Sequence, residues 1–536
     1  MKKIGIALDL GTSGFRGQAI DLETKRILKT VMTARHPLPG ANVIDHLNFA
    51  IDAGSDAAHQ IIIITINQII GLLRLPGQVI ERLAVCGNPI QLSLFENIEI
   101  RDLAYAGENK KRLLGIVPPD RGSKEYPASH FPELDINKDC HVFIPPAVEH
   151  EIGADALAML VLSGILEQKE ICLATDYGTN AEMALKVGDK IFTGSCAAGP
   201  ALEGQHIESG MLAAPGAIAD IHPEGTGHRC LVLNEEMQPE EGDLVSLESG
   251  AVLARGKLTA KGVTGTGVVA ALSRGFDTNL IRLPYINTPS TYLHLANGIR
   301  FGEDDLLEAG KAIGALRAGY LTLTAEAGIA VEDINTAYMA GASGTYVDAV
   351  KAMRIGMVPP RVKEIHQVGN TSLTMAREIV LNPARLRELD GIAGQLRASH
   401  CMFGNSKVFE KAYLLELSYW TEGMPWEQYE KFSKMYRLPA LPQPKTGTCA
   451  VTKVPRDILD VGAAGVVTIE KVGFEKKNEV EGCISCGHCI KECPERALQI
   501  DDKTITMRMD YCSGTACRRC EHVCPEKVFQ LNTFWL

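Results

Sequence analysis

The stretch IGIALDLGTSGFRGQAIDL, residues 4–22, decides the fold of the first part of the chain. An apolar run ends at Asp9, a turn of Gly, Thr and Ser follows at 11–14, and a second strand pattern leads away from the turn. Two strand patterns around a glycine-containing turn predict a β-hairpin. Backbone N–H groups at such a tip can bind a phosphate, and a carboxylate at the strand end can hold Mg²⁺ through water.

The same design recurs farther along the chain, in ICLATDYGTNAEMALKV at residues 171–187. Here the first strand pattern ends at Asp176, and the tip begins at Gly178. A third strand pattern, in AYMAGASGTYVDAV, ends in the small residues 341–344. Backbone without bulky side chains lets an adenosine approach closely. No GK[ST] follows any of these loops, so none is a Walker A motif.

The cysteines gather at the other end of the chain, where eight of the 15 lie between Cys483 and Cys524. The first four have the spacing C-x2-C-x2-C-x3-C-P, and the second four differ by a wider first gap. This is the run of a bacterial ferredoxin, in which the fourth cysteine binds the other of two 4Fe–4S clusters. We therefore expect one cluster on Cys483, Cys486, Cys489 and Cys524, and the other on Cys512, Cys517, Cys520 and Cys493. The alternative is a pair of structural zinc sites.

Length and composition narrow the class of protein. A chain of 536 residues with 46% apolar and 22% charged residues predicts two to four globular domains. The net charge of −11 argues against nucleic acid as a partner. Asp9 interrupts the apolar start, which does not suit a signal peptide, and the apolar run from Ile61 is too short to span a bilayer. We expect a cytoplasmic protein with no membrane partner.

Several segments together point to a family. Paired DxGT-type hairpins followed by a small adenosine loop resemble the superfamily of acetate and sugar kinases, heat-shock ATPases and actin. Further segments are similar to those of the reductive activators of corrinoid proteins: VCGNPIQLSLF at 85–95, IPPAVEHEIGADALA at 144–158, GSCAAGPALEGQHIESGM at 194–211, KGVTGTGVVAAL at 261–272, EAGKAIGALRAGYLTL at 308–323 and VGNTSLTMAREIVL at 368–381. The similarity covers most of residues 1–440. Most members carry a plant-type 2Fe–2S domain at the N-terminus. A C-terminal dicluster ferredoxin resembles the members that serve methylamine methyltransferases in methanogens.

The resemblance implies an α/β fold with an RNase H-like, two-lobed ATPase body, each lobe built on a mixed five-stranded sheet. The expected lobes are residues 1–168 and 169–440, followed by a linker or bridging segment, 441–480, and a small α+β ferredoxin domain, 481–536. A linker here would let the ferredoxin swing between partners if it were flexible.

The resemblance also implies an activity. Members of this family use ATP to help reduce the cobalt of a corrinoid protein from Co(II) to Co(I), with electrons passed here through two 4Fe–4S clusters. The implied partners are the corrinoid protein of a methyltransferase system, such as a methylamine-dependent one, and an unidentified low-potential electron donor.

Site residues follow by motif match. Asp9 and Asp176 are expected to hold Mg²⁺ or order the attacking water. The expected ATP-binding residues are Gly11, Thr12, Ser13, Gly178, Thr179, Asn180, Gly341, Ala342, Ser343 and Gly344. The family often has a second glycine where Ala342 stands, which puts the affinity for nucleotide in question. Glu203 matches a segment near the lobe interface and is a further candidate for Mg²⁺.

Three other functions remain open from the sequence. An ATP-dependent electron donor to a different target, such as a radical dehydratase, would usually have cluster cysteines inside the ATPase body. A carbohydrate kinase fused to a ferredoxin would release a phosphorylated product. An assembly factor would use ATP only to release a client, with the clusters as structural staples.

Overall fold

The computed structural model describes residues 2–40, 42–105, 107–148, 152–178, 180–197, 200–204, 206–211, 213–235, 237–396, 401–443 and 449–535. The chain forms two compact units: residues 1–158, 372–395 and 460–536 make up unit 1, and residues 159–371 and 396–459 make up unit 2. The ferredoxin domain and the 372–395 segment both belong to unit 1.

Unit 1 is built on a seven-stranded sheet with the order β22-β3-β2-β1-β4-β6-β5. The strands are β1 (Lys2–Leu10), β2 (Phe15–Asp21), β3 (Ile27–Thr33), β4 (Gln78–Gly87), β5 (Lys124–Pro127), β6 (His141–Ile144) and β22 (Val466–Ile469). β1, β2 and β3 form an antiparallel meander, while β4 runs parallel to β1. Because Asp9 pairs with Cys86 in this register, the carboxyl ends of β1 and β4 meet at one edge of the sheet.

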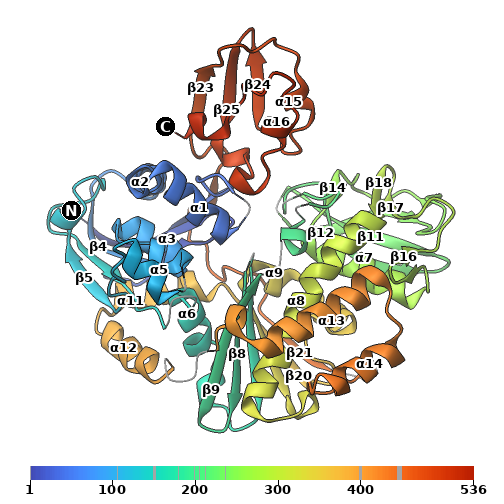
Figure 1. Cartoon of the computed structure of the whole chain (residues 1–536). Coiled ribbons are helices and arrows are strands. Elements are labelled where there is room, and N and C mark those ends of the chain that lie inside the picture. Colours follow the sequence, from blue (N-terminus) through green and yellow to red (C-terminus); the bar gives the residue numbers. More distant parts are fainter. Residues whose placement is uncertain are drawn as a thin grey trace. The chain divides into compact units, whose positions relative to one another are not determined.

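Helices cover both faces of this sheet (Figure 1). They are α1 (Val43–Ala53), α2 (Ser55–Leu73), α3 (Pro89–Glu96), α4 (Arg101–Ala104), α5 (Glu108–Leu113), α6 (Ala154–Leu162), α11 (Thr371–Leu381) and α12 (Arg385–Leu396). A Cβ at Gly17 would lie 2.7 Å from Ile69 of α2, and a Cβ at Gly5 would overlap Val380 of α11. Gly5 and Gly17 point to opposite faces, so the two glycines let a helix pack closely on each side.

Among the residues that the structure describes, α2 alone is long and apolar enough to cross a membrane by length and composition. Ten of its side chains are buried within unit 1, including Ile62, Ile66 and Ile69. A core helix passes the same test of length and composition, and burial of this kind is what a core helix shows.

Unit 2 is built on a six-stranded sheet with the order β21-β20-β19-β7-β8-β9. The strands are β7 (Cys172–Tyr177), β8 (Asn180–Val187), β9 (Lys190–Ala197), β19 (Thr336–Ala340), β20 (Glu364–Gly369) and β21 (Ala450–Lys453). A second, five-stranded sheet consists of β10 (Ala217–Glu224), β11 (Gly227–Leu233), β12 (Pro239–Val245), β13 (Val252–Ala254) and β14 (Gly262–Val263). Two ribbons follow it, β15 (Ile281–Arg282) with β16 (Tyr285–Ile286) and β17 (Tyr292–Ala296) with β18 (Ile299–Gly302).

The helices of unit 2 are α7 (Gly265–Asp277), α8 (Glu303–Ala327), α9 (Gly341–Tyr346), α10 (Ala349–Ile355), α13 (Lys407–Glu422) and α14 (Trp426–Met435). α8 and α13 lie side by side (Figure 1). Between them Arg317 of α8 pairs with Glu416 of α13 at 3.1 Å, and both side chains are buried. The Tyr429 hydroxyl donates to the same carboxylate, and the guanidinium lies 5.1 Å from the ring centroid of Tyr419. Removal of either residue would leave the other charge buried without its partner, which is strongly destabilising.

The segment expected as a linker or bridging segment, here called the bridging element, contributes one strand to each main sheet. β21 runs parallel to β20 at the edge of the unit 2 sheet, and β22 runs parallel to β3 at the edge of the unit 1 sheet. The expectation of five strands in each lobe is therefore wrong. The bridging element adds one strand to each sheet, and the hairpin partner β5 adds another to unit 1.

The ferredoxin domain has a three-stranded sheet with the order β23-β25-β24. Its elements are β23 (Glu475–Glu479), α15 (His488–Lys491), β24 (Leu498–Asp501), β25 (Thr504–Arg508) and α16 (Arg519–His522). β24 and β25 form a hairpin between the two cysteine sets, and β23 adds a third strand from the preceding segment.

Candidate nucleotide and iron–sulfur sites

The first predicted hairpin forms, with β1 and β2 joined through residues 11–14. Asp9 is buried at the end of β1, and the Arg16 guanidinium lies 3.4 Å from its carboxylate. A Cβ at Gly11 would lie 3.0 Å from the Gly14 carbonyl oxygen and 3.4 Å from Arg16 Nη1. The tip is thus a tight turn of small residues with one cation beside it. Such a tip can accept a phosphate on its N–H groups.

Two more residues join this hairpin, and sequence reasoning did not single them out. Asn88 caps α3 by accepting from the Gln91 N–H, and its side-chain amide donates to the Thr12 hydroxyl at 3.2 Å. Asp155 lies in the first turn of α6, where burial raises its pKa to about 6 and the nearby charge of Asp9 adds to the effect. Both residues stand inside segments that resemble the family, but no motif spacing marks either of them.

Replacing Asp155 by asparagine is expected to stabilise the nucleotide-free protein at pH 7.5. The folded state holds this carboxyl's pKa above the ordinary value of 3.8, so ionisation costs stability as pH rises from about 4 through about 6. At about 1.4 kcal/mol per pKa unit, the substitution should raise the free energy of unfolding by about 1–3 kcal/mol. Thermal unfolding at pH 5.0 and 7.5 without Mg²⁺ measures it, with the exposed Asp139→Asn as matched control. A variant that is less stable than the wild type at pH 7.5 would contradict this account.

The second predicted hairpin and the segment 341–344 meet within unit 2. β7 and β8 form the hairpin, and β19 lies parallel to β7 with Ala340 opposite Asp176. Gly341 has φ +78°, and a Cβ there would overlap Asp176 Oδ1 and lie 3.0 Å from the Tyr177 carbonyl oxygen. Only glycine combines that backbone conformation with that approach. The helix α9 begins at Gly341 itself, so the predicted loop is the first turn of a helix.

The predicted residues of the nucleotide site therefore fall into two sets. Asp9, Gly11, Thr12 and Ser13 lie together in unit 1. Asp176, Gly178, Asn180 and the element Gly341, Ala342, Ser343 and Gly344 lie together in unit 2. Thr179 and the side chain of Glu203 are outside the part of the chain that the structure describes. Their predicted roles stay predictions.

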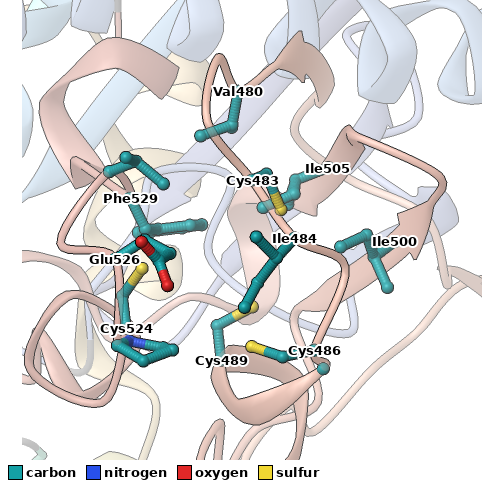
Figure 2. A pocket seen from close by; sticks show the side chains of 13 residues that line it. Val480, Cys483, Ile484, Cys486, Cys489, Ile500, Ile505, Cys524, Glu526 and Phe529 are labelled. Carbon is teal, nitrogen blue, oxygen red and sulfur yellow. The ribbon is translucent and has the colours of Figure 1, made fainter.

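The cysteines of the ferredoxin domain line two separate cavities. Figure 2 shows the sulfur atoms of Cys483, Cys486, Cys489 and Cys524 facing one shared space, with Ile484 and Phe529 beside them. Cys493, Cys512, Cys517 and Cys520 line the second cavity together with Arg518 and Arg519. The fourth cysteine of each sequence run thus faces the cavity of the other run.

The donors in each cavity suit an iron–sulfur cluster. Within the described residues, no three Cys, His, Asp or Glu side chains converge on a point that could hold a single metal ion. The four thiols instead surround a space, which is the arrangement that a cubane needs and a zinc ion does not. Backbone N–H groups also point at the sulfurs, with Ala497 N 3.3 Å from Cys493 Sγ and Gly514 N 3.4 Å from Cys512 Sγ. Such contacts stabilise the charge that thiolate-bound clusters carry.

The thiol of Cys524 has its own electrostatic setting. Burial acts to raise its pKa, but the backbone N–H groups of residues 526–529 bind the sulfur, and the resulting pKa lies below the ordinary value. Burial raises the pKa of Cys512 and of Cys520 to about 12, so these thiols are neutral unless iron binds them.

Comparisons with known proteins match three segments of the chain to described families. The family described as the RACo middle region matches residues 4–168, and the one described as the C-terminal ASKHA domain of RACo matches residues 170–430. The 4Fe–4S dicluster domain matches residues 482–528. By fold and site, the protein is an ASKHA-type body, the fold class of sugar kinases and actin, joined to a dicluster ferredoxin.

Two individual relatives indicate the family more specifically. A Methanosarcina barkeri protein named Co(II) methylated amine-specific corrinoid protein reductase is 50% identical over 499 residues, which are 93% of this chain and 92% of that protein. The corrinoid activation enzyme RamQ of Eubacterium limosum is 26% identical over 452 residues, covering 77% of this chain and 69% of that protein. The chain belongs to the reductive activators of corrinoid proteins.

A solved structure shares the fold. The reductive activator for corrinoid, iron–sulfur protein superposes with a TM-score of 0.61 at 23% identity. The match covers 78% of this chain and 66% of the length of that protein. The predicted fold, a two-lobed α/β ATPase body with a small ferredoxin domain, is confirmed.

Proposed function

We propose that this protein uses ATP to drive the reduction of a corrinoid protein's cobalt from Co(II) to Co(I). The observation that carries the proposal is the combination in one chain of two phosphate-type hairpins and two four-cysteine cavities. The corrinoid cobalt is the substrate, and it accepts one electron. Because the Co(II)/Co(I) couple lies below most cellular donors, the electron has to be driven uphill, and ATP supplies the free energy.

The ATPase body would bind the nucleotide, and the two cysteine sets near the C-terminus would carry the electron. The hairpin tips at residues 11–14 and 178–180 hold the phosphates, and Asp9 and Asp176 hold Mg²⁺ or order the attacking water. Residues 341–344 receive the adenosine. When bound by the two cysteine sets, 4Fe–4S clusters supply one-electron transfer at low potential. The N–H groups and arginines around the cavities set how readily an electron is accepted there.

We further propose a corrinoid protein of a methylamine-dependent methyltransferase as the partner, together with a separate low-potential electron donor. The 50% identity to the Methanosarcina barkeri protein, whose name specifies methylated amines, supports this choice. We also propose that the protein works in the cytoplasm. The two cavities, each lined by four cysteines, support two clusters per chain.

The test is made without oxygen. The reduced protein is mixed with a methylamine-type corrinoid protein in the Co(II) state, and the visible spectrum is followed for Co(I). We expect Co(I) with Mg-ATP but none without nucleotide or with the non-hydrolysable analogue Mg-AMPPNP. No Co(I) with Mg-ATP, when both clusters are intact and chemical reduction of the partner succeeds, would refute the proposal.

A further inference from the structure

The ferredoxin domain contacts the body of unit 1 at a few defined places. The Gly40 N–H donates to the Cys512 carbonyl oxygen at 2.8 Å, so a ligand of the second cavity is tied directly to the segment between β3 and α1. Phe49 of α1 meets Trp535 edge to face, with 5.2 Å between the ring centroids, and both side chains are buried. The domain is therefore docked through the side that carries the second cysteine set.

Arg35 carries a positive charge into this contact. Its guanidinium lies over the ring of Tyr511, 4.1 Å from the centroid, and Tyr511 directly precedes Cys512. Arg508 lies 3.8 Å from the same centroid and is held by Asp510 at 3.1 Å. A guanidinium over the face of an aromatic ring is attracted to the ring electrostatically. It also places a fixed positive charge next to the second cavity.

The same short segment reaches the phosphate hairpin. The Thr33 hydroxyl accepts from the Phe15 N–H at 2.8 Å, directly after the hairpin tip. A Cβ at Gly14 would lie 3.1 Å from the Thr33 carbonyl oxygen and 3.4 Å from that of Arg35. The hairpin tip, where a phosphate would bind, is therefore packed against the backbone of Arg35. The side chain of Arg35 stacks on Tyr511.

A second set of contacts joins the same two places. Asn88, whose amide binds Thr12 of the hairpin, also caps α3, on which Gln91 lies. The Gln91 side chain bonds His36 Nε2 at 3.0 Å and His46 Nδ1 at 2.9 Å, and the two buried imidazoles stack at 3.8 Å. Gln91 therefore ties His36 and His46 to the helix that Asn88 caps.

We infer that Arg35 is a positioning residue for the electron-transfer reaction, linking the phosphate hairpin at residues 11–14 to the loop that carries Cys512. Phosphate binding at the hairpin moves the backbone at 33–35. The Arg35 guanidinium then shifts relative to Tyr511 and changes the electrostatic setting of the second cavity. The inference rests on the ATP-dependent function proposed above. It adds the route by which nucleotide binding affects the redox domain.

The test uses the full-length protein with both clusters in place. The midpoint potential and the EPR spectrum of each cluster are measured with and without saturating Mg-AMPPNP. In the wild type, nucleotide should shift the potential and spectrum of the second cluster and leave the first unchanged. In Arg35→Ala the shift should vanish while the Kd for nucleotide stays within about twofold. Arg35→Lys, which keeps the charge but stacks less well, should restore part of the shift.

A matched control distinguishes the proposed role of Arg35 from the general effect of removing a positive charge near the second cavity. Arg519 is exposed and lines the second cavity from within the ferredoxin domain. Arg519→Ala should change the nucleotide-free potential of the second cluster and keep the full nucleotide-induced shift. A full shift in Arg35→Ala, or no shift in the wild type at saturated nucleotide, would overturn the inference.

A measurement on the wild type keeps the inference testable if Arg35→Ala does not fold. The Gly40 amide hydrogen is protected by its bond to Cys512, so hydrogen exchange of the peptide holding Gly40 reports on the docked contact. Mg-AMPPNP should change this exchange rate several-fold, and an unchanged rate would count against the link. ATP-dependent Co(I) formation with an unresponsive second cluster would refute the role of Arg35 and leave the proposed function standing. Absence of Co(I) would refute the function itself.

Discussion

Replacing Cys524 by serine is expected to remove the cluster of the first cavity, although Cys524 belongs to the second cysteine run of the sequence. Its sulfur faces the same space as Cys483, Cys486 and Cys489. Loss of one thiolate from a set of four should lower the iron content from about eight to about four atoms per chain. The EPR spectrum of the reduced Cys524→Ser protein should match that of Cys489→Ser, because both variants retain only the second cluster.

The reciprocal pair is the control for this result. Cys493 and Cys520 line the second cavity, so Cys493→Ser and Cys520→Ser should share a different residual spectrum. ATP binding should survive in all four variants, since the nucleotide residues lie elsewhere. If the spectrum of Cys524→Ser matched that of Cys520→Ser instead, each cysteine run would bind its own cluster, and the crossed pairing would be wrong.

Replacing Asp176 by asparagine is expected to lower ATP hydrolysis by at least about 100-fold, the range typical of losing a group that positions water or metal. The carboxylate stands at the end of β7 against Gly341, so it is fixed where the hairpin and the adenosine element meet. Asparagine keeps the size of the side chain and removes the charge that Mg²⁺ requires. ATP-dependent Co(I) formation should be lost with it.

The control for Asp176→Asn is Asp189→Asn, which changes an exposed carboxylate in the turn between β8 and β9 of the same unit. This variant should hydrolyse ATP at the wild-type rate. Iron content and the spectra of both clusters should be unchanged in both variants, because the cysteines lie in the other unit. Wild-type hydrolysis by Asp176→Asn would remove Asp176 from the reaction.

Local signals in the sequence were enough for the hairpins and for the cysteine sets. A strand that ends in an acidic residue before a glycine turn predicts a hairpin, because the residues that form the turn are neighbours in the chain. Cysteine spacing likewise carries the loop that wraps a cluster. The roles assigned to these residues, including the crossed pairing, stay predictions until the variants above are measured.

Residues brought in from distant segments could not be found in this way. Asn88 and Asp155 join the first hairpin from α3 and α6, and an asparagine cap or an aspartate in a first helical turn is common in any helix. Nothing in their spacing distinguishes them. Arg35 and Tyr511 are separated by most of the sequence. A single arginine beside a strand forms no motif that would predict their contact.

The strands β21 and β22 were missed for a different reason. The sequence around them is rich in Pro, Gly and Lys, which indicates a connection rather than a sheet. All four residues of β21 are exposed, so the alternation of buried and exposed positions that marks a strand is absent. Backbone hydrogen bonds to a ready-made edge, rather than burial, place these strands in their sheets.

These two edge strands bear on how the protein can be divided for study. A truncated chain that stops after residue 440 would lack β21 and β22 and so would uncover the outer sides of β20 and β3. A bare sheet edge with unpaired N–H and C=O groups is a template for aggregation. Expression of the ATPase body by itself should therefore give an insoluble or self-associating product unless the boundary is set beyond Ile469. The segment that leads to the redox domain thus forms part of the sheets of the ATPase body, whereas the redox domain has a sheet of its own.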